Sequence, residues 1–237
     1  MKIGIVGYGV VGKAMKSAMV QCGYEVYWFD IKPNKSNWHE ILAADIIFIC
    51  TPEQAVESIT GAIEDDRIFR KHIVVVRSTV PPGTCEQLSK KHGFPIFHNP
   101  EFLREAHSIL DAVNPPFIVL GGPDGLGLTA LTELYSPFRK PIFTMTSTES
   151  EMLKLWQNAK LACNISFANE MKKICDLYGV NSHLINNILT QHPVYPDHPW
   201  MIGKSFGGRC LPKDLDQLIS IYPSSLLTAV KSLNEKG

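Results

Sequence analysis

The segment "KIGIVGYGVVG" at the N-terminus places an apolar run directly before three glycines, Gly7, Gly9 and Gly12. A helical pattern follows, so the glycines lie where a buried strand turns into a helix. Such a turn uses one glycine for the tight bend, one where the backbone approaches a pyrophosphate and one where helix and strand pack closely. The N-terminus of the helix then faces the negative charge. The pattern predicts a dinucleotide site, with contacts from Gly7, Gly9, Val10, Val11 and Gly12.

The second predicted strand, "YEVYWFD", ends in Asp30, about 20 residues beyond the glycines, the spacing expected for the acid that binds a ribose hydroxyl. A carboxylate there repels a 2′-phosphate, so we predict NAD rather than NADP as the cofactor. Lys32 and Lys35 lie nearby and work against this preference.

Apolar runs continue to alternate with helical segments over 44–52, 72–84, 94–102, 115–122 and 140–145. Continuous apolar strands that end in polar turns are typical of buried parallel strands. The alternation predicts an α/β fold with a doubly wound, Rossmann-type parallel sheet, whose ligand crevice lies at the carboxyl ends of its strands. We expect the polar residues at these ends to share one cleft, with Thr51, Pro52 and Thr79 as cofactor contacts.

From about Thr148 the pattern becomes helical. The stretch "ESEMLKLWQNAKLACNISFANEMKKICDLYG" predicts one long helix that ends at Gly179, and "SHLINNIL" predicts a shorter helix. A loop rich in Pro, His and Gly follows over 190–209. We therefore predict an NAD-binding domain over residues 1–147 and a smaller helical domain over residues 148–237.

Charge and composition restrict the partners of this chain. The 23 Lys and Arg residues balance 23 Asp and Glu residues, whereas a nucleic-acid partner needs a concentrated basic surface. No apolar run approaches the length of a membrane span, so we expect a cytoplasmic protein with no membrane partner. His192 and His198 lie in a Pro-rich loop, and no histidine spacing is typical of a metal site, so we predict no metal.

Cys210 differs from the other cysteines because turn-forming and charged residues surround it in "SFGGRCLPKD". Pro212 is typical of a first helical turn, which would put Cys210 close to a helix N-terminus, where a thiolate is stabilised. Arg209 and Lys213 act in the same direction. Gly207 leaves room for a substrate to approach the backbone. The pattern predicts a reactive thiol.

Three further motifs accompany the glycine turn and the cysteine: "STVPPGT" with Thr79, "NPEFLREA" with Glu101 and Glu105, and "EMLKLWQN" with Lys154 and Asn158. Together the five motifs resemble, in order and spacing, the UDP-glucose/GDP-mannose dehydrogenase family across essentially the whole chain. The resemblance implies a nucleotide-sugar substrate such as UDP-glucose, whose primary alcohol is oxidised to a carboxylate by two hydride transfers to NAD.

The resemblance also assigns a use to the cysteine. Cys210 would trap the aldehyde as a thiohemiacetal, whose oxidation leaves a thioester for water to cleave. Asp214 would be the neighbouring acid or base. Lys154 would stabilise the oxyanion, and Asn158 would help to hold the oxyanion or a water.

Thr79 and Glu101 would, by the same resemblance, position a water and accept protons. Glu101 and Glu105 are four residues apart and would share one face if this turn is helical. The implied substrate contacts are Glu101, Phe102, Leu103, Arg104, Glu105, Lys154, Asn158 and Gly207.

Each of these residues alone has a plainer interpretation. Asp214 would complement a helix dipole from the first turn, and Lys154 with Asn158 would form a solvated helix face. The charges of "NPEFLREA" would form a surface ion-pair cluster. Two other functions also stay open: a two-electron hydroxyacid dehydrogenase, which has no use for Cys210, and a non-catalytic NAD-binding remnant that acts through protein contacts.

The chain departs from the family at its C-terminus. Family members continue into a further nucleotide-binding domain, whereas this sequence ends at "LLTAVKSLNEKG". The resemblance therefore implies a short form, for which either a separate protein would supply the missing domain or a smaller substrate would fill the gap, and it leaves the nucleotide and sugar open. Leu226, Leu227, Val230 and Leu233 form an apolar stripe on the terminal helix, which would be unusual if it were exposed on a monomer. In the family that the chain resembles, the equivalent helix lies at a dimer interface, so the resemblance implies a homodimer with this helix at or near its centre.

Overall fold

The computed structural model describes residues 1–31, 37–64, 72–191, 202–208 and 210–235. Its contacts divide the chain into two compact units, Met1–Lys154 and Leu155–Gly237. The first unit is an α/β domain built on a seven-stranded sheet, and the second is helical. The long helix α7 (Ser147–Leu177) begins in the first unit and continues into the second.

The sheet of the first unit has the strand order β2-β1-β3-β4-β5-β6-β7. The chain moves from β1 to β2 on one side and resumes with β3 on the other, so the topological switch point lies between β1 and β3. The strands are β1 (Lys2–Val6), β2 (Glu25–Phe29), β3 (Ile46–Ile49), β4 (Ile73–Val76), β5 (Ile96–His98), β6 (Ile118–Gly121) and β7 (Ile142–Met145). The predicted doubly wound sheet is confirmed.

One junction of the sheet is antiparallel, although a parallel sheet was predicted. β5 and β6 pair in antiparallel fashion, with His98 opposite Gly121, whereas every other neighbouring pair is parallel. A parallel neighbour needs a crossover that carries the chain back along the sheet. The segment between β5 and β6 instead places the short helix α5 (Ser108–Val113) against α1. Strand β6 therefore starts at the end of the sheet where β5 finishes.

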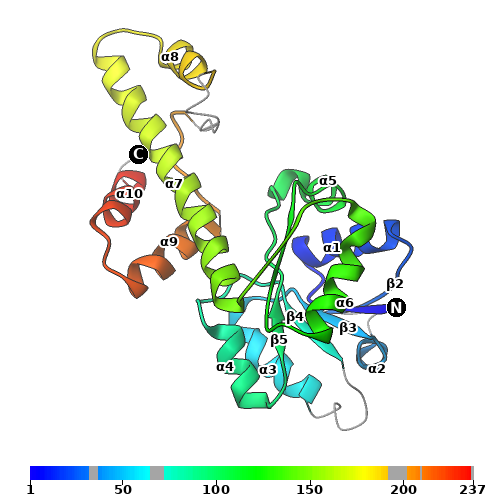
Figure 1. Cartoon of the computed structure of the whole chain (residues 1–237). Coiled ribbons are helices and arrows are strands. Elements are labelled where there is room, and N and C mark those ends of the chain that lie inside the picture. Colours follow the sequence, from blue (N-terminus) through cyan, green and yellow to red (C-terminus); the bar gives the residue numbers. More distant parts are fainter. Residues whose placement is uncertain (32–36, 65–71, 192–201, 209, 236–237) are drawn as a thin grey trace. The chain divides into compact units, whose positions relative to one another are not determined.

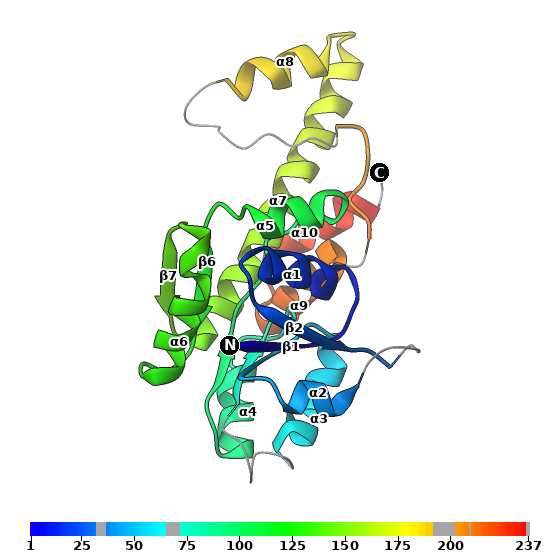
Figure 2. The same ribbon diagram turned by 90° about the vertical axis from the view of Figure 1, so that its right-hand side faces the viewer.

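Helices cover both faces of the sheet (Figure 1). Side chains alternate along each strand, so Ile46 and Phe48 pack beneath α1 and α6, while Ile47 and Ile49 pack beneath α2, α3 and α4. Each fully buried side chain of this size contributes about 1.5–3 kcal/mol. In Figure 2, α1 and α5 lie side by side over one face. The covering helices are α1 (Val10–Gln21), α2 (Trp38–Leu42), α3 (Glu53–Glu64), α4 (Thr84–His92) and α6 (Leu126–Tyr135).

The helical unit begins with most of α7. That helix ends as predicted at Gly179, which has φ +64°, and the Val180 amide donates to the Cys175 carbonyl. The predicted shorter helix is α8 (Ser182–Leu189), capped by the Asn181 side chain. Two further helices are α9 (Cys210–Ile221) and α10 (Ser225–Glu235). No helix in the described part of the chain is both long and apolar enough to cross a membrane.

The apolar stripe of α10 is largely covered within its own unit, so it offers little free apolar surface for the predicted dimer, which stays a prediction. Leu227 and Val230 are only 3% and 5% exposed, because α10 packs against α9 within the same unit. The ion pair between Lys231 and Asp216 joins the same two helices. Leu226 alone among the large side chains of the stripe is exposed, at 64%.

The first turn of α7 packs closely on the end of β6 at Gly121. A Cβ atom there would lie 2.6 Å from the Ser150 Cβ and 3.0 Å from the Ser147 Cα. We predict that Gly121→Ala lowers the free energy of unfolding by about 1–3 kcal/mol through overpacking. As a control, Gly61→Ala should raise it by about 0.5–1 kcal/mol, because Gly61 lies within helix α3 with its nearest neighbour 3.8 Å away. Denaturant unfolding measures both, and equal effects would contradict the close packing at Gly121.

Candidate functional site

The glycine turn between β1 and α1 has the geometry that its sequence predicts. Gly7 has φ +95°, and a Cβ there would lie 2.6 Å from the Cys50 carbonyl oxygen. A Cβ on Gly12 would lie 2.0 Å from the Gly7 carbonyl oxygen, so helix and strand need the glycine to pack. By contrast, a Cβ on Gly9 would meet no atom within 4 Å. The open space at Gly9 is where a ligand can approach the backbone.

The N-terminus of α1 offers uncapped amides next to a carboxylate. Its N-cap residue, Gly9, has no side chain to accept from these amides, and Val10 and Val11 supply the first turn. Asp30, directly after β2, accepts a hydrogen bond of 2.7 Å from the Tyr8 amide. The Tyr8 ring stacks on Trp28 at 4.0 Å, which ties the glycine turn to β2. The turn and the predicted ribose-binding carboxylate therefore lie side by side.

Polar residues from the neighbouring strands complete this end of the sheet. Thr51 follows β3, and its Oγ1 is buried without a hydrogen-bond partner among the described residues. The Ser78 hydroxyl, after β4, donates to the Thr51 carbonyl at 2.6 Å, which brings Thr79 to the same end. Thr79 is half-buried, and Pro52 is exposed. An uncapped helix, the open space at Gly9, a carboxylate and an unsatisfied hydroxyl all fit a bound dinucleotide.

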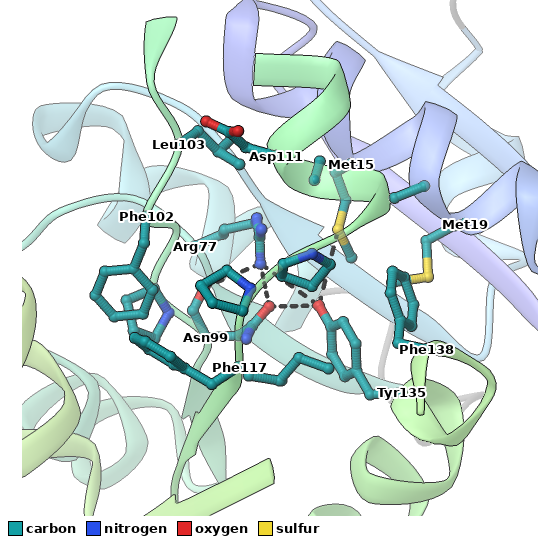
Figure 3. Close-up of a pocket in the computed structure, with 16 residues that line it drawn as sticks. Met15, Met19, Arg77, Asn99, Phe102, Leu103, Asp111, Phe117, Tyr135 and Phe138 are labelled. Carbon is teal, nitrogen blue, oxygen red and sulfur yellow. Dashed lines mark hydrogen bonds between the residues drawn. The ribbon is translucent and has the colours of Figure 1, made fainter. Parts of the chain in front are cut away.

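Beneath this end of the sheet lies a buried polar network (Figure 3). Arg77 donates from Nη1 to the backbone and side-chain oxygens of Asn99, and the Tyr135 hydroxyl donates to the same side chain. Asn99 in turn donates to the Val119 carbonyl at 2.8 Å. Burial raises the pKa of Tyr135 to about 12, so its hydroxyl stays protonated. The network joins the ends of β4, β5 and β6 to α6.

Sequence patterns alone did not predict this network. The available signal was that Arg77 and Asn99 each directly follow or end an apolar strand segment. The adjoining cavity measures about 40 Å³ and is lined mainly by apolar side chains, including Met15 and Phe138. Ligand pockets for small molecules are usually several hundred Å³, so this cavity is too small for a nucleotide sugar. The network holds the ends of these strands together next to the site, and it does not form the substrate pocket.

Lys154 is buried and forms an ion pair with the partly buried Glu101. The Lys154 Nζ lies 3.1 Å from the Glu101 Oε1 and 5.6 Å from the centre of the Phe102 ring. The other Glu101 oxygen accepts from the Leu103 amide at 2.7 Å. Lys154 is only 5% exposed and Asn158, one turn further along α7, only 6%. The interpretation of these two residues as a solvated helix face was therefore wrong.

The segment from Glu101 to Arg104 is not helical, so Glu101 and Glu105 do not share one helical face. A single 3-10 turn begins only at Glu105, which is exposed. Arg104 binds Asp111 of α5 through its backbone amide, Nε and Nη2, at 2.7–3.0 Å. These contacts lower the pKa of Asp111. Arg104 thus anchors the segment to α5, and the predicted surface cluster is replaced by two separate ion pairs.

In the helical unit, Cys210 is the first residue of α9, at a helix N-terminus as the sequence predicts, and its side chain is exposed. Asp214 lies one turn further along the helix and is 1% exposed. Its carboxylate accepts from Asn158 Nδ2 at 2.6 Å and lies 2.9 Å from Lys213 Nζ. Asp214 therefore lies beyond the first turn, so the helix-dipole interpretation was wrong. Gly207 is exposed in the segment that precedes α9.

Some predicted residues lie outside the described part of the chain: Lys32, Lys35, His192, His198 and Arg209. Among the residues that the structure describes, no group of three His, Cys, Asp or Glu side chains is arranged to hold a metal ion.

A glycine turn at the switch point of a doubly wound sheet, followed by a helical unit, defines the class of NAD-binding dehydrogenases. Residues 35–139 match the NAD binding domain of the UDP-glucose/GDP-mannose dehydrogenase family, and residues 148–236 match its central domain. The chain belongs to this family, and its cofactor is NAD.

The chain is 30% identical to the UDP-glucose 6-dehydrogenase YwqF of Bacillus subtilis over 93% of its own length. It is also 30% identical to a GDP-mannose 6-dehydrogenase of Pseudomonas aeruginosa over 92% of its length. It spans 62% and 63% of these two relatives. Among solved structures, a UDP-glucose dehydrogenase of Pyrobaculum islandicum matches with a TM-score of 0.90 and 25% identity, covering 99% of this chain and 68% of that one.

The ion pair of Lys154 and Glu101 leads to a stability prediction. Glu101→Gln leaves the Lys154 charge buried without its partner, which should lower the free energy of unfolding by about 3 kcal/mol. The double variant with Lys154→Met should recover much of this loss, because it removes the unpaired charge as well. The exposed pair of Lys91 and Glu57 is the control, and Glu57→Gln should change the free energy by less than about 1 kcal/mol. If the effects of Glu101→Gln and Lys154→Met on the free energy of unfolding simply add in the double variant, the two side chains are not energetically coupled, which would contradict this prediction.

Proposed function

We propose that the chain is an NAD-dependent nucleotide-sugar 6-dehydrogenase that oxidises the primary alcohol of UDP-glucose or a similar substrate to the carboxylate. The observation that carries the proposal is the exposed Cys210 at the first residue of α9. A helix N-terminus favours the thiolate over the thiol. A two-electron alcohol dehydrogenase needs no nucleophile, whereas a four-electron oxidation must retain an aldehyde between its two steps.

The proposed reaction balances with one thiol and one water. The first oxidation removes a hydride and a proton from the alcohol and yields the aldehyde. The Cys210 sulfur adds to the aldehyde carbon, and the thiohemiacetal loses a second hydride and proton to become a thioester. Water then attacks the thioester carbonyl, the carbon–sulfur bond breaks, and the carboxylic acid and the thiol are released. When bound, NAD accepts the hydride in each oxidation.

The acid–base and electrostatic roles follow from the partners of each residue. Asp214, one turn from Cys210, is held by Asn158 and Lys213, and we assign it the proton transfers to and from the sulfur. Lys154 is a buried cation whose charge stabilises an oxyanion as it develops. Glu101, its partner, accepts a proton, and Thr79 positions water.

The remaining predicted residues hold the ligands. Gly9, with Val10 and Val11, contacts the pyrophosphate, Gly7 and Gly12 shape the turn, and Asp30 binds the ribose. The segment Phe102–Glu105 and Gly207 contact the sugar nucleotide. Asp30 also repels a 2′-phosphate, which favours NAD over NADP.

We predict two NADH for each sugar oxidised by the wild-type chain, with the product carboxylate identified by mass. Cys210→Ser should lower kcat by at least about 1,000-fold, because serine cannot replace the thiolate nucleophile. Cys163→Ser is the matched control and should keep both rate and stoichiometry, because burial raises the pKa of this half-buried thiol in α7.

Other outcomes would support the alternatives. One NADH per substrate with an aldehyde or ketone product would favour a two-electron hydroxyacid dehydrogenase. Normal NAD binding without oxidation of any nucleotide sugar would favour a non-catalytic protein that acts through contacts. An unchanged rate in Cys210→Ser would remove this thiol from the mechanism.

We also propose a homodimer, the assembly that the family resemblance implies. Large apolar side chains are exposed along one side of α7, where Trp156, Phe167 and Ile174 follow helical spacing and are 52%, 66% and 58% exposed. Helix α8 also exposes large apolar side chains, Leu184 and Ile188. Because apolar patches of this kind are unusual on monomers, a second copy of the chain is the occupant that we propose.

The dimer can be tested by sedimentation. Phe167→Glu on α7 should shift the chain from dimer to monomer, because it places a charge in the proposed apolar interface. Leu226→Glu on α10 is the matched control and should leave the dimer intact, because Leu226 is a large exposed side chain outside the proposed interface. A wild-type chain that is monomeric at high concentration would refute the proposed dimer. If Leu226→Glu dissociates the dimer and Phe167→Glu does not, the interface lies on α10 instead.

A further inference from the structure

Glu151 is a buried carboxylate that the proposed chemistry does not use. It lies near the start of α7 and is 0% exposed. Its Oε2 accepts from the Gly83 amide at 2.6 Å, and its Oε1 accepts from the Cys85 amide at 2.8 Å. Both amides belong to the N-terminus of α4, so one side chain of α7 caps a helix more than 60 residues earlier in the chain.

Helix α4 depends on this distant cap because it has none of its own. Its N-cap residue, Gly83, has no side chain and takes φ +90°. The amides of a first helical turn need acceptors, and a carboxylate at this end also meets the positive end of the helix dipole. Thr148 makes a second contact with α4, donating to Glu86 at 3.0 Å.

Burial works against the charge of Glu151. Desolvation raises the pKa of this carboxyl, the nearby Glu86 raises it further, and the two amide hydrogen bonds lower it. The Cys85 thiol, also buried, faces the same carboxylate. Both oxygens must be acceptors to satisfy both amides, so an uncharged side chain of the same size satisfies only one of them.

Glu151 is connected to the site in two directions. Toward α4, only Val80, Pro81 and Pro82 separate Gly83 from Thr79, and the two prolines restrict the backbone of this connection. Along α7, Lys154 lies three residues further on, less than one helical turn. The same carboxylate therefore holds the turn that carries Thr79 and the helix that carries Lys154.

We infer that Glu151 is a positioning residue, which sets the Thr79 turn for NAD binding and Lys154 for its pairing with Glu101. The part that concerns Lys154 rests on the proposed function. The part that concerns NAD does not, because NAD affinity is measured without any sugar substrate.

A matched pair of glutamates in the first turns of α7 allows a sharp test. Glu149 is exposed and caps the start of α7 through Thr146, whereas Glu151 is buried and caps α4. Calorimetry should show NAD affinity about 10-fold weaker in Glu151→Ala, since small displacements of positioned groups have effects of this size or larger. Glu151→Gln should retain part of the affinity, because it keeps one acceptor, and Glu149→Gln should equal wild type.

Hydrogen exchange provides a second readout that a loss of global stability would not reproduce. Amides of residues 83–86 should exchange faster in Glu151→Gln than in Glu149→Gln, under conditions where both variants are folded. If Glu151→Ala does not fold, the comparison between the two glutamine variants decides the question.

The inference is overturned if folded Glu151→Gln and Glu151→Ala bind NAD as wild type does, or if Glu149→Gln weakens binding equally. A chain that oxidises no nucleotide sugar but loses NAD affinity on substitution of Glu151 would refute the proposed function and leave this inference standing. The reverse result, full oxidation by Glu151→Ala with unchanged KM for NAD, would refute the inference alone.

Discussion

A buried polar face on the first two turns of α7 is the constraint on which the rest of the site depends. Ser147, Ser150, Glu151 and Lys154 follow helical spacing and are all at most 5% exposed. Buried polar and charged groups are costly unless each has a partner. Here Ser150 pairs with His98, Glu151 with two amides of α4, and Lys154 with Glu101. These interactions fix the position of the first two turns of α7 on the end of the sheet.

The carboxyl ends of the strands must in turn be rigid enough to supply these partners. Asn99 does this for β5, because its side chain connects Arg77, Tyr135 and the Val119 carbonyl. Ser78 joins β4 to the Thr51 carbonyl after β3. The antiparallel junction has a single residue pair, so the hydrogen bond from Asn99 to Val119 adds a needed link between β5 and β6. Thr79 directly follows Ser78, and Glu101 lies two residues after Asn99.

Much of the fold and part of the site could be predicted from local sequence. Gly7 and Gly12 identify the turn between β1 and α1, because no other residue fits the backbone conformation and close packing there. Gly179 identifies the end of α7 in the same way, through its positive φ. Cys210 and Pro212 identify the start of α9. Prediction failed where long-range contacts decide. The pairing of Glu101 with Lys154 spans 53 residues, so spacing within "NPEFLREA" indicated the wrong neighbour for Glu101.

The sequence by itself therefore determined the dinucleotide turn, the order of strands and helices, and the family with its NAD cofactor, because each depends on local backbone geometry or on motifs in order. Only the tertiary structure decided which side chains are buried and with whom they pair. Lys154 and Asn158 look like a solvated face in sequence and are buried against Glu101 and Asp214. Leu227 and Val230 form part of an apolar stripe in the sequence, and in the structure α9 covers them. Burial is a property of packed neighbours, and distant segments of the chain supply those neighbours.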